Sequence, residues 1–160
     1  MVINWTADNV AHLLRRTGFG AHPDDIQEAM NSDPATVVAG LFKPWRKSDQ
    51  FGSFKNAWLE DLQLWWIRRM LRSSSPLIEK LTLFWHNHFA TGFHKLESPK
   101  WMHQQNRTLR KHCLGRFRDL LGAIARNGAM LIWLDNASNI AADPNENWAR
   151  ELMELFTIGL

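Results

Sequence analysis

The sequence predicts an all-α fold, an irregular bundle of about seven or eight helices. The first reason is a repeated helix-start signal, in which proline follows an oxygen-bearing side chain. Such a side chain accepts from free backbone N–H groups, and proline has no N–H to satisfy. Apolar residues also recur at spacings of three and four, and no segment alternates like a strand. The start signal occurs at Asp33-Pro34, Ser75-Pro76, Ser98-Pro99 and Asp143-Pro144.

These signals place the elements in chain order. A first helix starts at Thr6 and ends before Gly18, with Val10, Ala11 and Leu14 facing inward. The next predicted helices cover residues 23–30, 34–41, 56–71, 76–90, 99–113 and 116–127, the last closed by Gly128, and a final helix starts at residue 144. Residues 43–53 are expected to form a loop, and residues 129–134 a short apolar turn.

Residues 56–71 carry the clearest helical spacing. The residues that fall three and four apart there are Trp58, Leu62, Trp65, Trp66 and Arg69. This spacing is typical of a helix.

The composition fits a globular domain whose helices pack through aromatic rings. Hydrophobic residues make up 45% of the 160 residues and charged residues 22%, which excludes a disordered tail. With nine Trp, nine Phe and no Tyr, aromatic packing is favoured, although an exposed subset of rings could form a binding surface. The net charge of +3 is well below that of a dedicated nucleic-acid binder.

Cysteine usage and the N-terminus bear on the compartment. Cys113 is the only cysteine, so no intrachain disulfide can form, which fits a reducing environment. The first residues show neither a signal peptide nor a membrane span. The chain as given is therefore expected to be soluble and cytoplasmic, with residues 1–160 forming a single helical domain or a domain fragment.

Several segments together resemble a known family. They are AHLLRRTGFG at 11–20, KLTLFWHNHFA at 80–90, QN at 105–106, LR at 109–110, FRDLL at 117–121, MLIWLD at 130–135 and PNENWARELMELFT at 144–157. In this order, and over nearly the whole chain, these segments resemble the bacterial domain of unknown function 1800 family.

The resemblance implies a fold type but no activity. The family has no established reaction, cofactor or catalytic residues to carry over. Its members look like long, mainly helical proteins that continue past the segment ending here at Leu160, and many carry export signals. By this resemblance the chain is expected to be the N-terminal part of a larger helical protein, truncated at its C-terminus. The missing C-terminal region of the same protein is then its expected partner.

His86 and His88 are the first candidates for chemistry. Neutral imidazoles are good ligands for zinc or a similar metal. On a continuous helix, however, residues two apart point about 200° apart, so at most one of the two could reach a given ion. A helix that unwinds near Asn87 would let both chelate. The structural alternative is a buried, hydrogen-bonded His88 and a His86 on the polar face.

Glu151 and Glu154 are the second candidates. Three residues apart and next to Arg150, they could ligate a metal or act as a catalytic acid–base pair. No cofactor is predicted outright. A divalent metal site becomes plausible if these carboxylates meet His86 or His88 across a helix interface, as in helix-bundle carboxylate sites.

The same stretch also has a purely structural explanation. Asp143 would be the N-cap and Glu146 would complete a capping box, while Glu146 and Arg150 could form a surface salt bridge. One apolar stripe would bury the helix through Trp148, Leu152, Leu155 and Phe156.

A basic segment is the third candidate. It holds Arg107, Arg110, Lys111, His112, Arg116 and Arg118, and could bind phosphates or an anionic polymer. A solvated helix face is the commoner explanation, and no recognised nucleic-acid motif accompanies these residues. Gly18-Phe19-Gly20 is likewise a weak dinucleotide signal, because it lacks a preceding strand and the remaining glycines.

Three functions follow from these candidates. The leading one is a helical module of a larger protein that acts through protein–protein contacts, with exposed Trp and Phe as the interface. The second is a metal-dependent, hydrolase-like enzyme using His86 or His88 with Glu151 and Glu154. The third is anion or nucleic-acid binding through residues 107–118. The sequence leaves open whether the protein is an enzyme.

Overall fold

The computed structural model describes residues 4–43, 52 and 57–159. Within these residues the fold is all-α, as predicted, and the only strand-like pairing is an isolated bridge between Ile140 and Asp143. Nearly all of the loop expected at residues 43–53 lies outside the described residues. None of the helices in the described part combines the length and the apolar character needed to cross a membrane.

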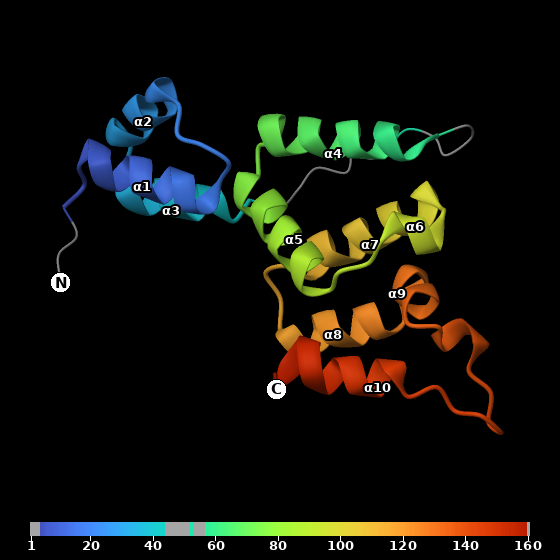
Figure 1. Cartoon of the computed structure of the whole chain (residues 1–160). Helices are drawn as coiled ribbons and strands as arrows, with labels where there is room; N and C mark the ends of the chain where they lie inside the picture. Colours follow the sequence, from blue (N-terminus) through green and yellow to red (C-terminus); the bar gives the residue numbers. More distant parts are fainter. Residues whose placement is uncertain (1–3, 44–51, 53–56, 160) are drawn as a thin grey trace. The chain divides into compact units, whose positions relative to one another are not determined.

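The chain forms two compact units. Unit 1 contains residues 1–50 and 64–80, and unit 2 contains residues 51–63 and 81–160. Two longer helices, α4 (Leu59–Arg72) and α5 (Pro76–His88), contribute residues to both units (Figure 1).

Three short helices open unit 1, and the sequence predicted all of them: α1 (Ala7–Thr17), α2 (Pro23–Met30) and α3 (Pro34–Leu41). The predicted cap of α3 is present, since the Asp33 carboxylate accepts from the backbone N–H of Thr36 at 2.9 Å. Helix α1 packs against α2, and the indole N–H of Trp5 donates to the Ala29 carbonyl at 3.1 Å. Val10 and Ala11 are buried as expected.

A buried ion pair joins α4 to α5 inside unit 1. Two guanidinium nitrogens of Arg69, Nε and Nη2, donate to Oε1 of Glu79 at 3.1 and 2.7 Å. The two residues are only 7% and 0% exposed. Charges this far from water persist only when they are paired, so this contact fixes which side of α4 faces inward.

Lys80 of α5 holds the end of α1. Its ammonium group donates to the backbone carbonyls of Arg15 at 2.8 Å and Gly18 at 2.6 Å. The last carbonyls of a helix have no partner within the helix, and a cation is favourable at this end of the helix dipole. Lys80 thereby fixes the chain where it leaves α1.

Unit 2 is built from helices around one apolar core. After α5 come α6 (Phe93–Leu96), α7 (Pro99–His112), α8 (Phe117–Ala125), α9 (Gly128–Trp133), the 3₁₀ turn η2 (Asn136–Ser138), α10 (Asn147–Glu151) and the π-helical segment η3 (Leu152–Thr157). Helix α7 packs against α8 and α9 (Figure 1). The buried core consists of Phe89, Leu109, Leu120, Ile124, Met130, Leu134 and Phe156.

Two predicted boundaries in the middle of the chain were wrong. Helix α4 starts at Leu59 rather than at residue 56, because the Asp61 carboxylate accepts from the Trp58 N–H at 2.9 Å and fixes the first turn there. Gly128 does not close α8. Instead, the Asn127 side chain accepts from the Ala129 N–H at 3.1 Å and starts α9, which replaces the expected turn.

The predicted start of the last helix was also wrong. Helix α10 begins at Asn147, and the predicted N-cap Asp143 lies in a turn before it. Glu146, predicted to complete a capping box, is itself the N-cap and makes no side-chain capping bond, whereas the side-chain oxygen of the preceding Asn145 accepts from the Asn147 N–H at 2.8 Å. The amide nitrogens of Asn145 and Asn147 both donate to the Leu134 carbonyl, at 3.2 and 3.4 Å. These bonds set where the helix can begin.

The ion pair between Arg69 and Glu79 predicts a large mutational effect. Arg69→Met removes the guanidinium and leaves the buried Glu79 carboxylate without it, so the free energy of unfolding should fall by about 3 kcal/mol. Urea denaturation followed by circular dichroism measures this loss. Arg68→Met, at the exposed neighbouring position, should change it by less than about 0.5 kcal/mol. Equal losses in the two variants would contradict the assignment.

Candidate functional site

Segments from three parts of the chain meet in an aromatic cluster, defined by the rings of Trp85, His88, Phe89, Phe117 and Phe156. The Trp85 ring stacks on Phe89 and Phe117 with centroids 6.0 and 5.7 Å apart. The His88 ring meets the edge of Phe89 at 4.7 Å and lies 6.1 Å from Phe156. The end of α5, the start of α8 and η3 therefore share one set of side chains.

His88 is half-buried, and its ring orientation is fixed by a backbone carbonyl. Its Nε2 lies 3.0 Å from the carbonyl oxygen of Phe156. A carbonyl only accepts, so Nε2 must carry the proton, and in the neutral ring Nδ1 is then an acceptor. The Phe156 carbonyl is available because it lies in the last turn of η3. The hydrogen bond to Phe156 therefore fixes the orientation of the His88 ring.

The π-helical turn decides which residues of η3 face inward. Phe156 is 5% exposed, whereas Leu155, predicted on the same apolar stripe, is 64% exposed. A π turn bonds residue i to i+5, so each residue advances by a smaller angle than in an α-helix. This rotation brings Phe156 into the core and leaves Leu155 outside. The prediction for Leu155 was therefore wrong.

His86 does not join His88. Helix α5 continues to His88, so the two imidazoles point in different directions, as expected for an unbroken helix. His86 was expected on a polar face but is half-buried. Burial lowers its pKa from the usual 6.5, which keeps the ring neutral.

The carboxylates of Glu151 and Glu154 share one cation. Arg150 places Nη2 3.6 Å from Glu151 Oε1 and Nη1 3.7 Å from Glu154 Oε2. The pairing of Arg150 is thus with these two residues, where the sequence suggested Glu146. Over residues 4–43, 52 and 57–159, no three His, Cys, Asp or Glu side chains form a group that could hold a metal ion.

The basic segment is divided between exposed residues and one buried arginine. Arg107 and Lys111 are exposed on α7, and Arg116 and Arg118 are exposed at the start of α8. Arg110, which the sequence grouped with them, is only 3% exposed. A buried guanidinium cannot contribute to a surface that tracks a polyanion.

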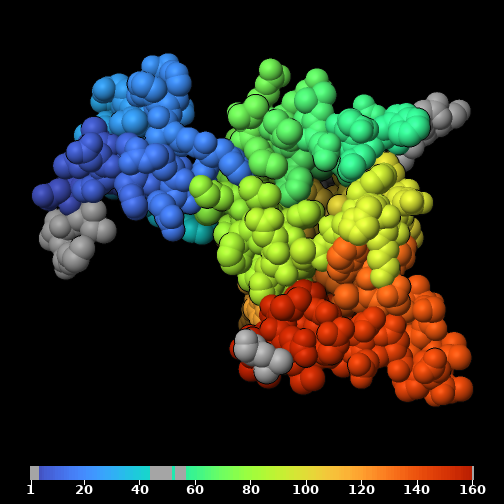
Figure 2. Space-filling model, viewed as in Figure 1, coloured from blue at the N-terminus to red at the C-terminus, as the bar shows by residue number. Residues whose placement is uncertain are grey.

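An exposed apolar stripe on α4 was not predicted. Leu64, Ile67 and Leu71 lie three and four residues apart on one side of the helix and are 46%, 51% and 73% exposed. The space-filling view shows the side chains of α4, in green, at the molecular surface (Figure 2). We call these three residues the α4 stripe.

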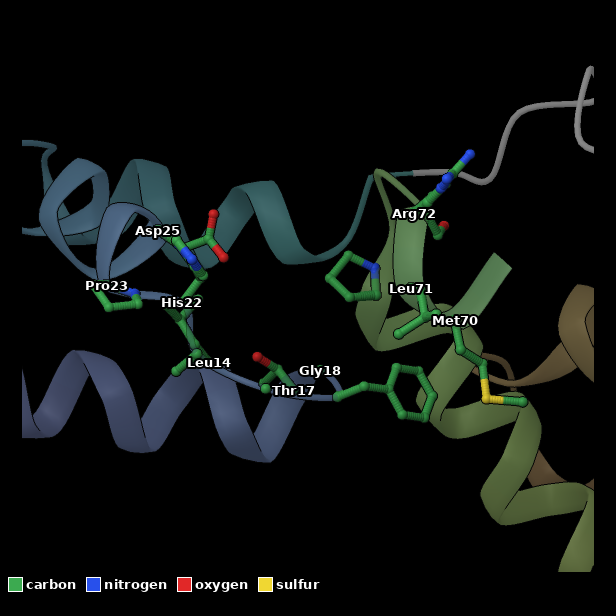
Figure 3. Close-up of a pocket in the computed structure, with 14 residues that line it drawn as sticks. Leu14, Thr17, Gly18, His22, Pro23, Asp25, Met70, Leu71 and Arg72 are labelled. Carbon is green, nitrogen blue, oxygen red and sulfur yellow. The ribbon is translucent and has the colours of Figure 1, made fainter. Parts of the chain in front are cut away.

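A pocket of about 740 Å³ in unit 1 was also missed by the sequence reasoning. Figure 3 shows that one side is formed by His22, Pro23 and Asp25 and the other by Met70, Leu71 and Arg72. Thr17, Gly18, Phe19 and Gly20 also line it. The sequence reasoning weighed Gly18-Phe19-Gly20 as a weak dinucleotide signal and used residues 11–20 for the family resemblance, but it did not relate this segment to a pocket.

Comparison with known proteins identifies one family. The sequence model of a family described as "Protein of unknown function (DUF1800)" matches residues 12–160. No curated protein and no solved structure matches the chain. The matched range includes the aromatic cluster, the α4 stripe and the pocket.

The lowered pKa of His86 predicts that acid destabilises the protein. Below about pH 6.5 the unfolded chain takes up a proton at His86 that the folded protein does not, so stability falls as the pH is lowered. Urea unfolding midpoints at about pH 7.5 and about pH 5.5 measure the loss. His86→Gln should reduce it and His12→Gln, at an exposed position on α1, should not. An unchanged loss in His86→Gln would refute this cause.

The hydrogen bond of His88 makes a separate prediction. His88→Phe keeps an aromatic ring in the cluster but removes the donor to the Phe156 carbonyl, so it should destabilise the protein by about 1 kcal/mol. His12→Phe, at an exposed position on α1, should change stability by less than about 0.5 kcal/mol. Equal stability of His88→Phe and the unmodified protein would show that the bond contributes nothing.

Proposed function

The chain belongs to the DUF1800 family, whose description assigns no reaction, and we propose that it is a helical module that binds another protein through the α4 stripe. The observation that carries this proposal is the exposure of Leu64, Ile67 and Leu71 in one line. Single exposed apolar residues are common on protein surfaces. A contiguous apolar row on a helix is not, and such rows mark interaction sites.

The helix geometry supports a docking face. At about 100° per residue, Leu64, Ile67 and Leu71 fall within about 60° of one another around α4. Arg69 lies on the opposite side and is buried with Glu79. The helix therefore has two apolar sides, one used inside the protein and one available outside it.

The interface differs from the one suggested by composition. Exposed Trp and Phe were the expected contact residues, and Trp58 and Phe84 are indeed 74% and 56% exposed. Trp58 precedes the first residue of α4 and Phe84 lies on α5, so they form no continuous row, whereas the α4 stripe is continuous and aliphatic. The stripe is thus the stronger candidate for a helix-sized contact.

A two-step experiment tests the proposal. A photo-reactive amino acid at position 67 of the whole chain identifies a cross-linked protein in cells, with the same group at exposed Glu28 on α2 as the control. The purified partner is then titrated against the unmodified chain and Leu71→Asp. Leu71→Asp should weaken binding at least about tenfold, because an apolar contact residue is replaced by a charge.

The controls decide the outcome. Glu28→Gln should bind the partner as tightly as the unmodified chain, since α2 carries no part of the stripe. A cross-linking pattern at position 67 that matches position 28 would count against docking on α4. So would a partner that binds Leu71→Asp with unchanged affinity.

A further inference from the structure

The α4 stripe leads directly into the pocket of unit 1. Leu71 belongs to both, since it ends the stripe and lines the pocket. The apolar walls of the pocket come from Leu14, Phe19, Met70 and Pro76 together with Leu71. A row of aliphatic side chains that ends in a hollow with apolar and polar walls has the form of a surface that takes a helix and one large anchoring side chain.

The edge of the stripe is positively charged. Arg68 and Arg72 are exposed and follow Leu64 at four and eight residues, so they flank the stripe on one side. Between Leu64 and Arg72 the helix has no acidic residue. Among the described residues neither guanidinium has a hydrogen-bond or ion-pair partner. Two unpaired cations beside an apolar row favour a partner with acidic flanks.

Resting on the proposed function, we infer that the partner presents an amphipathic helix with acidic residues along one edge. Its apolar side chains lie along Leu64 and Ile67, and a large apolar side chain enters the pocket beyond Leu71. Its carboxylates pair with Arg68 and Arg72. Asp25 on the opposite wall repels carboxylates, so the acidic edge lies on the α4 side of the pocket.

The concave shape of the pocket favours a protein over a lipid surface. A helix that lies on a membrane inserts a projecting apolar face into the lipid. Here the apolar surface is hollowed beside the helix, between the residues labelled in Figure 3. A hollow of this kind is filled by a side chain, not by the flat boundary of a bilayer.

Three synthetic helical peptides test the inference on the whole chain. They share one apolar seam with a central Trp and differ only in the flanking residues, which are Glu, Gln or Lys. Binding is measured by calorimetry at low and at moderate salt, and vesicles of anionic phospholipid serve as a fourth probe. The Glu peptide should bind at least about tenfold more tightly than the Lys peptide and should lose affinity with salt.

Two variants separate the charged edge from the pocket. Arg68→Glu, at an edge position outside the pocket, should reduce or reverse the preference for the Glu peptide over the Lys peptide. Gly20→Leu adds a side chain at a position that lines the pocket and meets no atom within 4 Å of its Cβ, so it should weaken the Glu peptide about tenfold. Gly40→Leu, on α3 and outside the pocket, is the matched control.

Each failure has its own meaning. Equal binding of all three peptides overturns the acidic edge, and an unchanged affinity of Gly20→Leu overturns the anchoring pocket. Binding of vesicles without any peptide overturns the inference in favour of a lipid surface. If none of the probes binds, the inference is also overturned. The proposed function is tested separately, by the cross-link at position 67 and by the affinity of Leu71→Asp.

Discussion

The burial of Arg69 with Glu79 is the constraint on which the surface of unit 1 depends. A guanidinium and a carboxylate removed from water must stay in contact, so α4 cannot rotate about its own axis without separating them. With Arg69 held inward, Leu64, Ile67 and Leu71 are held outward on the other side. The exposed apolar row is thus a consequence of the buried pair and not a loosely packed face.

Side chains from distant elements cap the helix ends in both units. Lys80 donates to the carbonyls that end α1, and His88 donates to the Phe156 carbonyl that ends η3. Lys95 donates to the Trp133 carbonyl that ends α9, at 2.7 Å. Each of these carbonyls lies at the end of a helix and has no partner within that helix. The side chain that donates to it comes from another element, so the bond also holds the two elements together. Short helices that would be marginal alone are held in this way.

Sequence reasoning succeeded where the determinants are local. Asp33 and Pro34 start α3 because the capping atom and the missing N–H lie within one turn of each other. It failed at Asp143, because the start of α10 is set by Asn145 and Asn147 reaching back to Leu134. It failed at Leu155 for a related reason, since the apolar spacing assumes an α-helix, whereas residues 152–157 form a π turn whose Phe156 packs in the core of unit 2. Neither long-range contact leaves a short-range pattern.

The α4 stripe is a further case in which the sequence pattern alone does not determine the structure. Of the regularly spaced residues in the segment 56–71, Leu62 and Arg69 are buried, whereas Trp58 is 74% exposed. Leu64, Ile67 and Leu71 have an equally regular spacing, but periodicity alone cannot rank two apolar sides of one helix. Only the partner of Arg69 decides between them, and Glu79 is ten residues away on another helix. When a helix has two regular apolar sides and one buried charge, the position of the oppositely charged partner determines which side faces the core.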